Sequence, residues 1–399
     1  MKRQLLGVAA ILLSISTYAQ DNPLWMRYCA ISPDGTTIAF TYKGDIYTVP
    51  STGGRASQIT TNPAHDTKPI WSPDGKKIAF ASDRMGSMDI FEVNKEGGIP
   101  KRLTTHSGNE TPVAYKDAGH ILFLANIMPT AEDAQFPSGQ FQQVYEVNTE
   151  GGRPILFSSM PMEDISINHT GNTLLYHDKK GYEDPWRKHH TSSITRDIWL
   201  CSLNGNRTFR KQTAFNGEDR TPVWASDDKS FYYLSEEKGS FNIFKRDIDG
   251  NTSKQITNHT KHPVRFLSAA SNGTLCYGYD GEIYTVKEGA IPQKVQISIV
   301  TDKNDKDLIR QIKRSGATEI SLSPDAKEIA FVLRGDVYVT STEYSTTKQI
   351  TNTPQQERDI HFSPDGRSIV YASERNGLWQ IYQTSLALSL IHISEPTRH

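Results

Sequence analysis

Basic, imidazole and hydroxyl side chains gather in one short stretch of this 399-residue sequence, between Gly181 and Thr195. The stretch reads Trp186-Arg187-Lys188-His189-His190-Thr191-Ser192-Ser193, and Arg196 follows it. Guanidinium and ammonium groups suit peptide carboxylates, so Arg187, Lys188 and Arg196 are candidate substrate-binding residues for a peptide. A loop that packs on the fold, or that contacts another domain, explains the same stretch more simply.

Nucleophilic catalysis and metal binding are less well supported for this stretch than peptide binding. Ser192 or Ser193 near His189 could suggest a nucleophile and its base, but neighbours in sequence do not make the geometry of a triad. His189 and His190 would point to opposite sides of a strand, and no third ligand is spaced for a metal. The sequence contains neither a Gly-x-Ser-x-Gly elbow nor a His-Glu-x-x-His motif. We therefore expect no catalytic residue, no metal and no cofactor in this chain.

Four aspartates recur at regular spacing and could be mistaken for calcium ligands: Asp34, Asp74, Asp325 and Asp365. The acids of an EF-hand crowd into one loop, whereas these are distributed along the chain. Three of the four lie in Ser-Pro-Asp-Gly and one in Ser-Pro-Asp-Ala. Proline presets φ, aspartate accepts hydrogen bonds from the following amides and glycine tolerates positive φ, so we interpret these residues as turn formers.

The turns belong to a repeat of about 40 residues. A short apolar run follows each turn, as in Thr37-Ile38-Ala39-Phe40, and a second strand such as Asp45-Ile46-Tyr47 comes about ten residues later. A polar turn and a third strand then follow, as at Gln58-Ile59-Thr60. About 40 residues with four strands correspond to one propeller blade, which cannot bury its faces alone. The fold class expected is all-β.

Six copies of the repeat begin near residues 31, 71, 112, 164, 222 and 266, and two more begin near 320 and 361. Between the two groups lies a charged segment that could form a short helix over Asp305 to Arg314. We expect a six-bladed β-propeller over 22–297, a linker over 298–316, and the first blades of a second, truncated propeller over 317–387. The alternative is one eight-bladed ring with an insertion.

Neither end of the chain is expected to contribute to the fold. Lys2 and Arg3, an apolar run from Leu5 to Ile15, and Thr17-Tyr18-Ala19 are typical of a signal peptide cleaved after Ala19. An uncleaved anchor is the alternative. This pattern predicts a periplasmic or secreted protein. The final residues, 388–399, resemble a translated sequencing adapter, so we expect a non-native tail and a longer parent protein.

Composition limits the classes of partner. The sequence has 44 Lys and Arg residues against 45 Asp and Glu residues, so no basic excess supports nucleic-acid binding. Cys29, Cys201 and Cys276 lie far apart in the sequence and are too few for a disulfide framework. We expect all three to be small buried hydrophobic residues.

The Ser-Pro-Asp-Gly repeats resemble those of TolB-type propeller proteins. The larger layout, six blades and then a second propeller, resembles the N-terminal part of tricorn proteases and their exported bacterial relatives over residues 22 to 387. The family has a similar Trp-plus-basic insertion before an Ile-Trp strand, here Ile198-Trp199. Some members hold the substrate's terminal carboxylate with two arginines entering the third blade. The matching stretch here, Ser107 to Thr111, contains no arginine.

The resemblance implies the propeller portion of an exported tricorn-like serine protease that degrades peptides, whose catalytic module is missing from this chain. The propeller would serve as a scaffold and would gate short, unfolded polypeptide substrates, because folded proteins cannot enter its narrow channel. The intact parent is expected to be a homo-oligomer. One alternative is a non-enzymatic TolB-like envelope module that binds a partner. The other is the propeller of a prolyl-oligopeptidase-like peptidase.

Overall fold

The computed structural model describes residues 23–127, 141–300 apart from 183, 185 and 188–190, 314–343 and 347–386. The expected signal peptide, the short helix over Asp305 to Arg314 apart from its last residue, and the tail lie outside this set. The chain divides into two compact units, Met1–Lys306 and Asp307–His399. All regular elements in the described residues are β-strands, and none of these residues forms a helix long and apolar enough to cross a membrane.

The first unit contains six four-stranded sheets among its described residues. In each sheet the strands follow one another in chain order, and neighbouring strands are antiparallel. Sheet 1 consists of β1 (Arg27–Ile31), β2 (Thr37–Tyr42), β3 (Asp45–Pro50) and β5 (Ser57–Gln58). Sheet 2 consists of β6 (Asp66–Trp71), β7 (Lys77–Ser82), β8 (Asp89–Asn94) and β9 (Lys101–Arg102). Sheet 3 consists of β10 (Thr111–Asp117), β11 (His120–Ala125), β12 (Gln143–Asn148) and β13 (Ile155–Ser158).

The other three sheets repeat this order. Sheet 4 consists of β14 (Met162–Ile167), β15 (Thr173–Asp178), β16 (Ile198–Ser202) and β17 (Thr208–Lys211). Sheet 5 consists of β18 (Asp219–Trp224), β19 (Ser230–Ser235), β20 (Asn242–Asp247) and β21 (Ser253–Gln255). Sheet 6 consists of β22 (Arg265–Ala269), β23 (Leu275–Tyr279), β24 (Glu282–Val286) and β25 (Gln293–Lys294).

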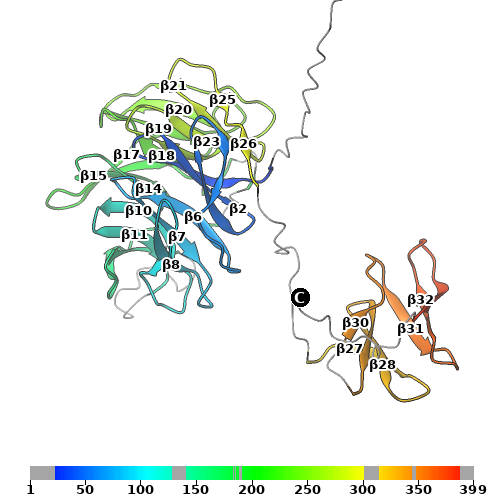
Figure 1. Cartoon of the computed structure of the whole chain (residues 1–399). Helices are drawn as coiled ribbons and strands as arrows, with labels where there is room; N and C mark the ends of the chain where they lie inside the picture. Colours follow the sequence, from blue (N-terminus) through cyan, green and yellow to red (C-terminus); the bar gives the residue numbers. More distant parts are fainter. Residues whose placement is uncertain are drawn as a thin grey trace, which may run out of the picture. The chain divides into compact units, whose positions relative to one another are not determined.

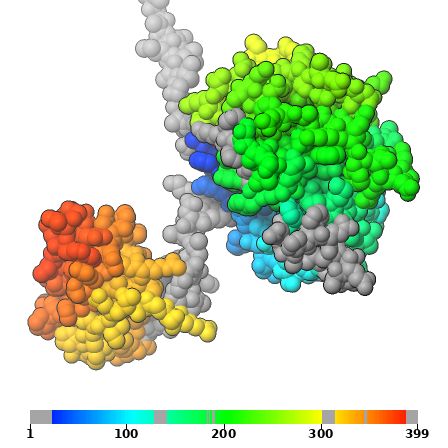
Figure 2. Space-filling view, turned by 180° about the vertical axis from the view of Figure 1, so that it is seen from behind, coloured from blue at the N-terminus to red at the C-terminus, as the bar shows by residue number. Residues whose placement is uncertain are grey.

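The first strand of each sheet lies innermost. Neighbouring first strands contact one another in chain order, and β22 contacts β1, so the sheets surround one axis in a ring (Figure 1). Each of the six repeat starts expected from the sequence falls within one of these first strands. Seen from behind, residues of sheets 4 and 5, coloured green, form much of the visible face of this unit (Figure 2).

The second strands are buried on both faces, which explains their apolar runs. Ile38 and Ala39 in β2, and Ile78 and Ala79 in β7, point to opposite faces of their strands and are fully buried between adjacent sheets. The three cysteines are free and buried, as the sequence predicts. Stacked sheets bury apolar side chains that a single sheet would leave exposed, so each sheet depends on its two neighbours.

The recurrent aspartates form turns, as predicted. Ser72 Oγ donates to Asp74 Oδ1 at 2.7 Å, and the Lys76 amide donates to the same oxygen at 3.1 Å. The same two bonds recur at Asp34, Asp325 and Asp365. These hydrogen bonds lower the pKa of each of the four carboxyl groups.

The ring closes between its first and last sheets. Strand β26 (Ile297–Ser298) pairs in parallel with β4 (Gly54–Arg55), and the Gly54 amide donates to the Gln296 carbonyl at 2.8 Å. In the preceding turn Gly53 has φ of 92°, and a Cβ there would lie 2.6 Å from the same carbonyl oxygen. Close backbone approach therefore requires glycine at this position.

The second unit has a four-stranded sheet, β27 (Ala317–Leu322), β28 (Glu328–Leu333), β29 (Asp336–Ser341) and β30 (Thr347–Gln349). A three-stranded sheet follows, β31 (Glu357–Phe362), β32 (Ser368–Ser373) and β33 (Gln380–Ser385). Ile320 on the first sheet is 75% exposed and Ile381 on the second is 81% exposed. These apolar residues lie on strands that would be covered if further sheets flanked the pair.

Gly53→Ala tests the closure, with Gly97→Ala as its matched control. Gly97 has nearly the same φ, 94°, but its Cβ would meet only the Ile59 carbonyl at 3.6 Å. We expect Gly97→Ala to lower the free energy of unfolding by about 1 kcal/mol and Gly53→Ala by about 2–3 kcal/mol, because only the latter also displaces a backbone carbonyl. Urea denaturation measures both, and equal losses would contradict this account of the closure.

A buried carboxyl group should make the stability of the first unit depend on pH. Burial, reinforced by nearby Asp89, raises the pKa of fully buried Glu110 to about 7 from an ordinary 4.5. The charged form is thus disfavoured in the fold, and stability should fall as the pH rises from about 4.5 to 7, by up to about 3 kcal/mol. We expect Glu110→Gln to exceed the wild type in stability at pH 8 and to match it near pH 4.5.

The control for this prediction is Asp66→Asn. Both Asp66 oxygens accept hydrogen bonds from Arg84 Nη2 at 2.9 Å. Asp66 is thus a buried carboxylate that is paired with an arginine, unlike Glu110. Removing its charge should destabilise the protein at both pH values. A wild-type stability that is flat between pH 4.5 and 8 would refute the role of Glu110.

Candidate functional site: the axial cavity

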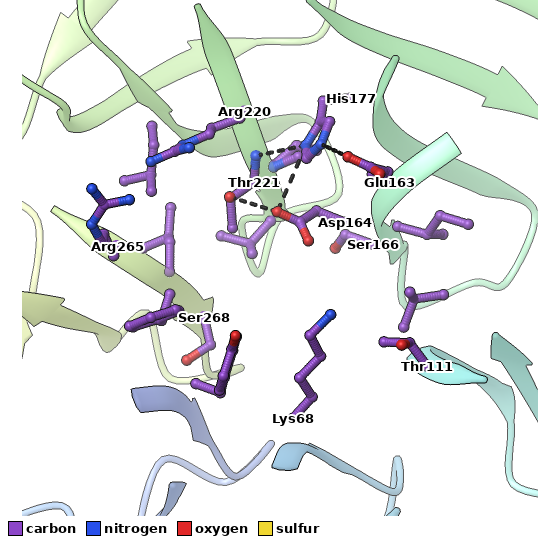
Figure 3. Close-up of a pocket in the computed structure, with 18 of the residues that line it drawn as sticks. Lys68, Thr111, Glu163, Asp164, Ser166, His177, Arg220, Thr221, Arg265 and Ser268 are labelled. Atoms are coloured by element: carbon purple, nitrogen blue, oxygen red, sulfur yellow. Dashed lines mark hydrogen bonds and ion pairs between the residues drawn. The ribbon is translucent and has the colours of Figure 1, made fainter. Parts of the chain in front are cut away.

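A cavity of about 720 Å³ lies on the axis of the first unit. Residues from the first strands of all six sheets line it, which places it inside the ring rather than between two blades. Its volume is in the range of small-molecule and peptide sites. Figure 3 shows side chains from several sheets converging on the open space at its centre.

Five lining residues have an unusual backbone conformation. They are in the left-handed region although none is glycine, with φ between 48° and 58°: Tyr28, Lys68, Asp164, Thr221 and Phe266. Each lies at an irregularity in the pairing of a first strand with the second strand of its sheet. Such bulges redirect side chains, and left-handed non-glycine residues cost about 1 kcal/mol or more each. The bulges thus place one side chain per sheet into the cavity, in five of six sheets.

Lys68 projects into the cavity from sheet 2 (Figure 3). Among the described cations that line the cavity, its ammonium group alone forms no hydrogen bond or ion pair with a described residue; it lies 5.8 Å from the centre of the Tyr28 ring. Burial lowers the pKa of Lys68, although the carboxylates of Asp164 and Glu163 act in the opposite direction. An anion entering the cavity would find this group available.

Asp164, His177 and Thr221 lie together on the opposite side of the cavity (Figure 3). Thr221 Oγ1 donates to Asp164 Oδ2 at 2.7 Å, and the same oxygen lies 3.7 Å from His177 Nδ1. An activated nucleophile would require a hydroxyl that donates to the imidazole, as in a catalytic triad. Here the hydroxyl donates to the carboxylate instead, so this group orients Asp164 and does not form a nucleophile.

Glu163 and His177 are held by fixed partners. The Thr221 amide donates to His177 Nδ1 at 3.3 Å, which leaves Nε2 to donate to Glu163 at 3.3 Å. Lys179 Nζ donates to the other oxygen of Glu163 at 2.7 Å. Burial would raise the pKa of Glu163, but His177 and Lys179 outweigh it and hold this pKa well below its ordinary value.

A second charged group surrounds Glu218, immediately before β18. Arg196 Nη1 donates to Glu218 Oε1 at 3.0 Å, Arg220 Nη1 lies 3.4 Å from the same oxygen, and Arg187 Nη2 donates to Oε2. Arg187 Nη1 also lies 3.7 Å from Glu236. Burial lowers the pKa of Arg220 to about 10. Three guanidinium groups therefore share one buried carboxylate, which satisfies charges that would be costly alone.

The structure places Arg187 and Arg196 together, as the sequence suggested, but their guanidinium groups are bound to carboxylates of the chain. Only Arg196 of the two lines the cavity. Lys188, His189 and His190 lie outside the described residues. The role of Arg187, Lys188 and Arg196 in binding peptide carboxylates stays a prediction. No group of three or more potential metal ligands occurs among the described residues.

Sequence reasoning missed Lys68, Asp164 and Glu218. A signal for the first two exists: each left-handed residue lies four positions before the residue that begins a turn, as Lys68 does before Ser72. In the second unit Asp359, with φ of 55°, stands in the same relation to Ser363. The signal is positional rather than chemical, since the residue types differ from sheet to sheet.

Glu218→Gln should strongly destabilise the first unit. The variant leaves Arg187, Arg196 and Arg220 buried without their shared anion, and we expect a loss of about 3–4 kcal/mol in the free energy of unfolding. Glu150→Gln is the control, because Glu150 pairs with Lys101 on the exposed surface and should change stability little. A loss at Glu218 no larger than that at Glu150 would show that the network does not hold the arginines.

Known proteins with a propeller at the N-terminus resemble this chain in sequence. The family model of the tricorn protease N-terminal beta propeller domain matches residues 23–290. Tricorn protease homolog 1 of Streptomyces coelicolor is 24% identical over 365 residues, which cover 89% of this chain and 32% of the relative. The tricorn protease homolog of Saccharolobus solfataricus is 27% identical over 295 residues, which cover 70% of this chain and 26% of the relative.

The fold of a solved structure agrees. The crystal structure of the tricorn protease matches with a TM-score of 0.63 at 19% identity, over 91% of this chain and 36% of that chain. This chain spans between about a quarter and a third of the length of these relatives. The family match covers the six sheets and the cavity almost completely. The chain belongs to the tricorn protease N-terminal beta propeller domain family.

Proposed function

We propose that this chain is the N-terminal propeller portion of an exported tricorn-like serine protease that degrades peptides. In this proposal the six sheets are the complete set of blades of one propeller. The second unit contributes the opening blades of another, and the catalytic module lies outside this chain. The observation that carries the proposal is a cavity enclosed by all six first strands in a chain of the tricorn N-terminal propeller family.

The proposed task of the propeller is to admit short, unfolded peptide segments and exclude folded proteins. A cavity of about 720 Å³ is too small to hold a folded domain. The Lys68 ammonium, which has no hydrogen-bond or ion-pair partner among the described residues, suits a peptide carboxylate, and the Asp164 carboxylate across the cavity suits an amine. Arg187, Lys188 and Arg196 stay proposed contacts of the peptide. Arg187 and Arg196 would contact it while they are also paired with Glu218.

Export and assembly are further parts of the proposal. The N-terminal sequence supports cleavage after Ala19 and a periplasmic or secreted location. The relatives support a homo-oligomeric parent by analogy alone. Reading the genomic DNA beyond codon 387 tests the parent: continuation into further blades and a serine protease module is expected. An immediate stop codon would favour the non-enzymatic binding module instead.

Lys68→Met tests peptide binding by the cavity, and calorimetric titration with tetraalanine and with its C-terminal amide measures it. We expect the wild type to bind the free acid about tenfold more tightly than the amide, because a charge-assisted hydrogen bond contributes about 1–2 kcal/mol. Lys68→Met should abolish this difference. Lys76→Met is the control, since Lys76 is 77% exposed and remote from the cavity lining. Equal binding of acid and amide by the wild type would refute the role of Lys68.

A further inference from the structure

Trp186 contacts sheets other than the one whose strands its segment connects. It belongs to the connection between β15 and β16 of sheet 4, yet the Trp186 ring lies 4.7 Å from the guanidinium carbon of Arg27, which begins β1 of sheet 1. Sheets 1 and 4 are opposite one another in a ring of six sheets taken in chain order. Trp186 therefore lies away from the sheet whose strands its segment connects, beside sheet 1 and in the lining of the cavity.

Sheet 6 provides a second set of contacts. Arg265 Nη2 donates to the Trp186 carbonyl at 2.6 Å, and the Phe266 ring meets the Trp186 ring edge to face with centres 6.1 Å apart. The Arg265 guanidinium carbon also lies 5.2 Å from the centre of the Trp186 ring. Guanidinium groups on aromatic rings and a hydrogen bond to the backbone fix both the side chain and the main chain of Trp186.

Sheet 5 anchors the next residue along the chain. Arg187 is largely buried and pairs with Glu218 and Glu236, both fully buried. Breaking these pairs would leave buried charges without partners, so this anchor resists opening. Trp186 itself remains 43% exposed, which means that one side of the segment faces solvent.

All these contacts lie at one end of the cavity. Arg27 and Arg265 are the first residues of their strands, and Glu218 immediately precedes β18. Tyr182, Asp184 and Trp186 of the same connection also line the cavity. Trp186 and Arg187 therefore lie at the end of the cavity where the first strands begin, and not at the end where the aspartate turns lie.

We propose that Trp186 and Arg187 form a strap that closes the axial cavity at the end where the first strands begin. A ligand then enters and leaves by the opposite end, so the cavity receives the free end of a short peptide and is not threaded by a continuous chain. This inference deepens the proposed peptide-binding function. The strap itself rests only on contacts within the chain and can be tested without a peptide.

Lys68 serves as the reporter of access. The protein is treated with a bulky amine-reactive biotin ester, and mass spectrometry measures the rate of modification at Lys68 and at exposed Lys76. We expect Trp186→Ala to raise the rate at Lys68 at least twofold, because it adds a second entrance to the one at the opposite end, and to leave the rate at Lys76 unchanged. Trp186→Phe keeps an aromatic ring but loses part of the contact with Arg27, so its rate of modification at Lys68 should lie between those of the wild type and Trp186→Ala. This variant keeps the test valid if the alanine variant misfolds.

Trp25→Ala is the matched control. Trp25 also lies on the Arg27 guanidinium, at 5.4 Å, but it is 69% exposed and does not line the cavity. Its removal should leave modification of Lys68 unchanged. The strap is refuted if Lys68 is modified at the wild-type rate in folded Trp186 variants. It is also refuted if Trp25→Ala raises the rate of modification of Lys68 equally. If Trp186→Ala opens the cavity but tetraalanine does not bind, the strap stands and the peptide-binding function fails.

Discussion

Closure of the ring is the constraint on which the rest of the structure depends. A four-stranded sheet with two apolar faces must be covered on both, and only a closed ring gives every sheet two neighbours. One hydrophobic cluster shows this directly, because it joins Ile38 and Phe40 of sheet 1 to Cys276 and Ile283 of sheet 6. The residues that meet there are more than 230 positions apart, so the closure carries a large entropic cost that this burial offsets.

The cavity is a consequence of the same closure. Left-handed backbone at Lys68 or Asp164 would be unfavourable in an isolated hairpin, but in the ring the neighbouring sheets hold each first strand in place. The bulges then present residues of different chemistry at equivalent positions around one axis. A repeat whose strands are uniform in geometry thereby builds a site that is not uniform in charge, with an ammonium group on one side and a carboxylate on the other.

Buried charge has two different fates in this ring. Around Glu218, guanidinium groups and carboxylates satisfy one another and tie the insertion to sheet 5. The Glu110 carboxyl group forms no ion pair with any residue that the structure describes, and burial raises its pKa instead. The first arrangement fixes the segment that carries Trp186, whereas the second makes the charge state of the interior respond to pH.

The sequence by itself determined the all-β class, the positions of the repeats and the role of aspartates such as Asp74, because turns and strand periodicity are local properties. It also pointed to the insertion containing Arg187 and to the family. It did not identify Lys68, Asp164 or Glu218 as the groups around the axis. Only the tertiary structure decided these, since ring closure brings together residues from strands far apart in sequence, and since buried Glu218 and Glu236 take up the guanidinium group that the sequence had offered to a ligand.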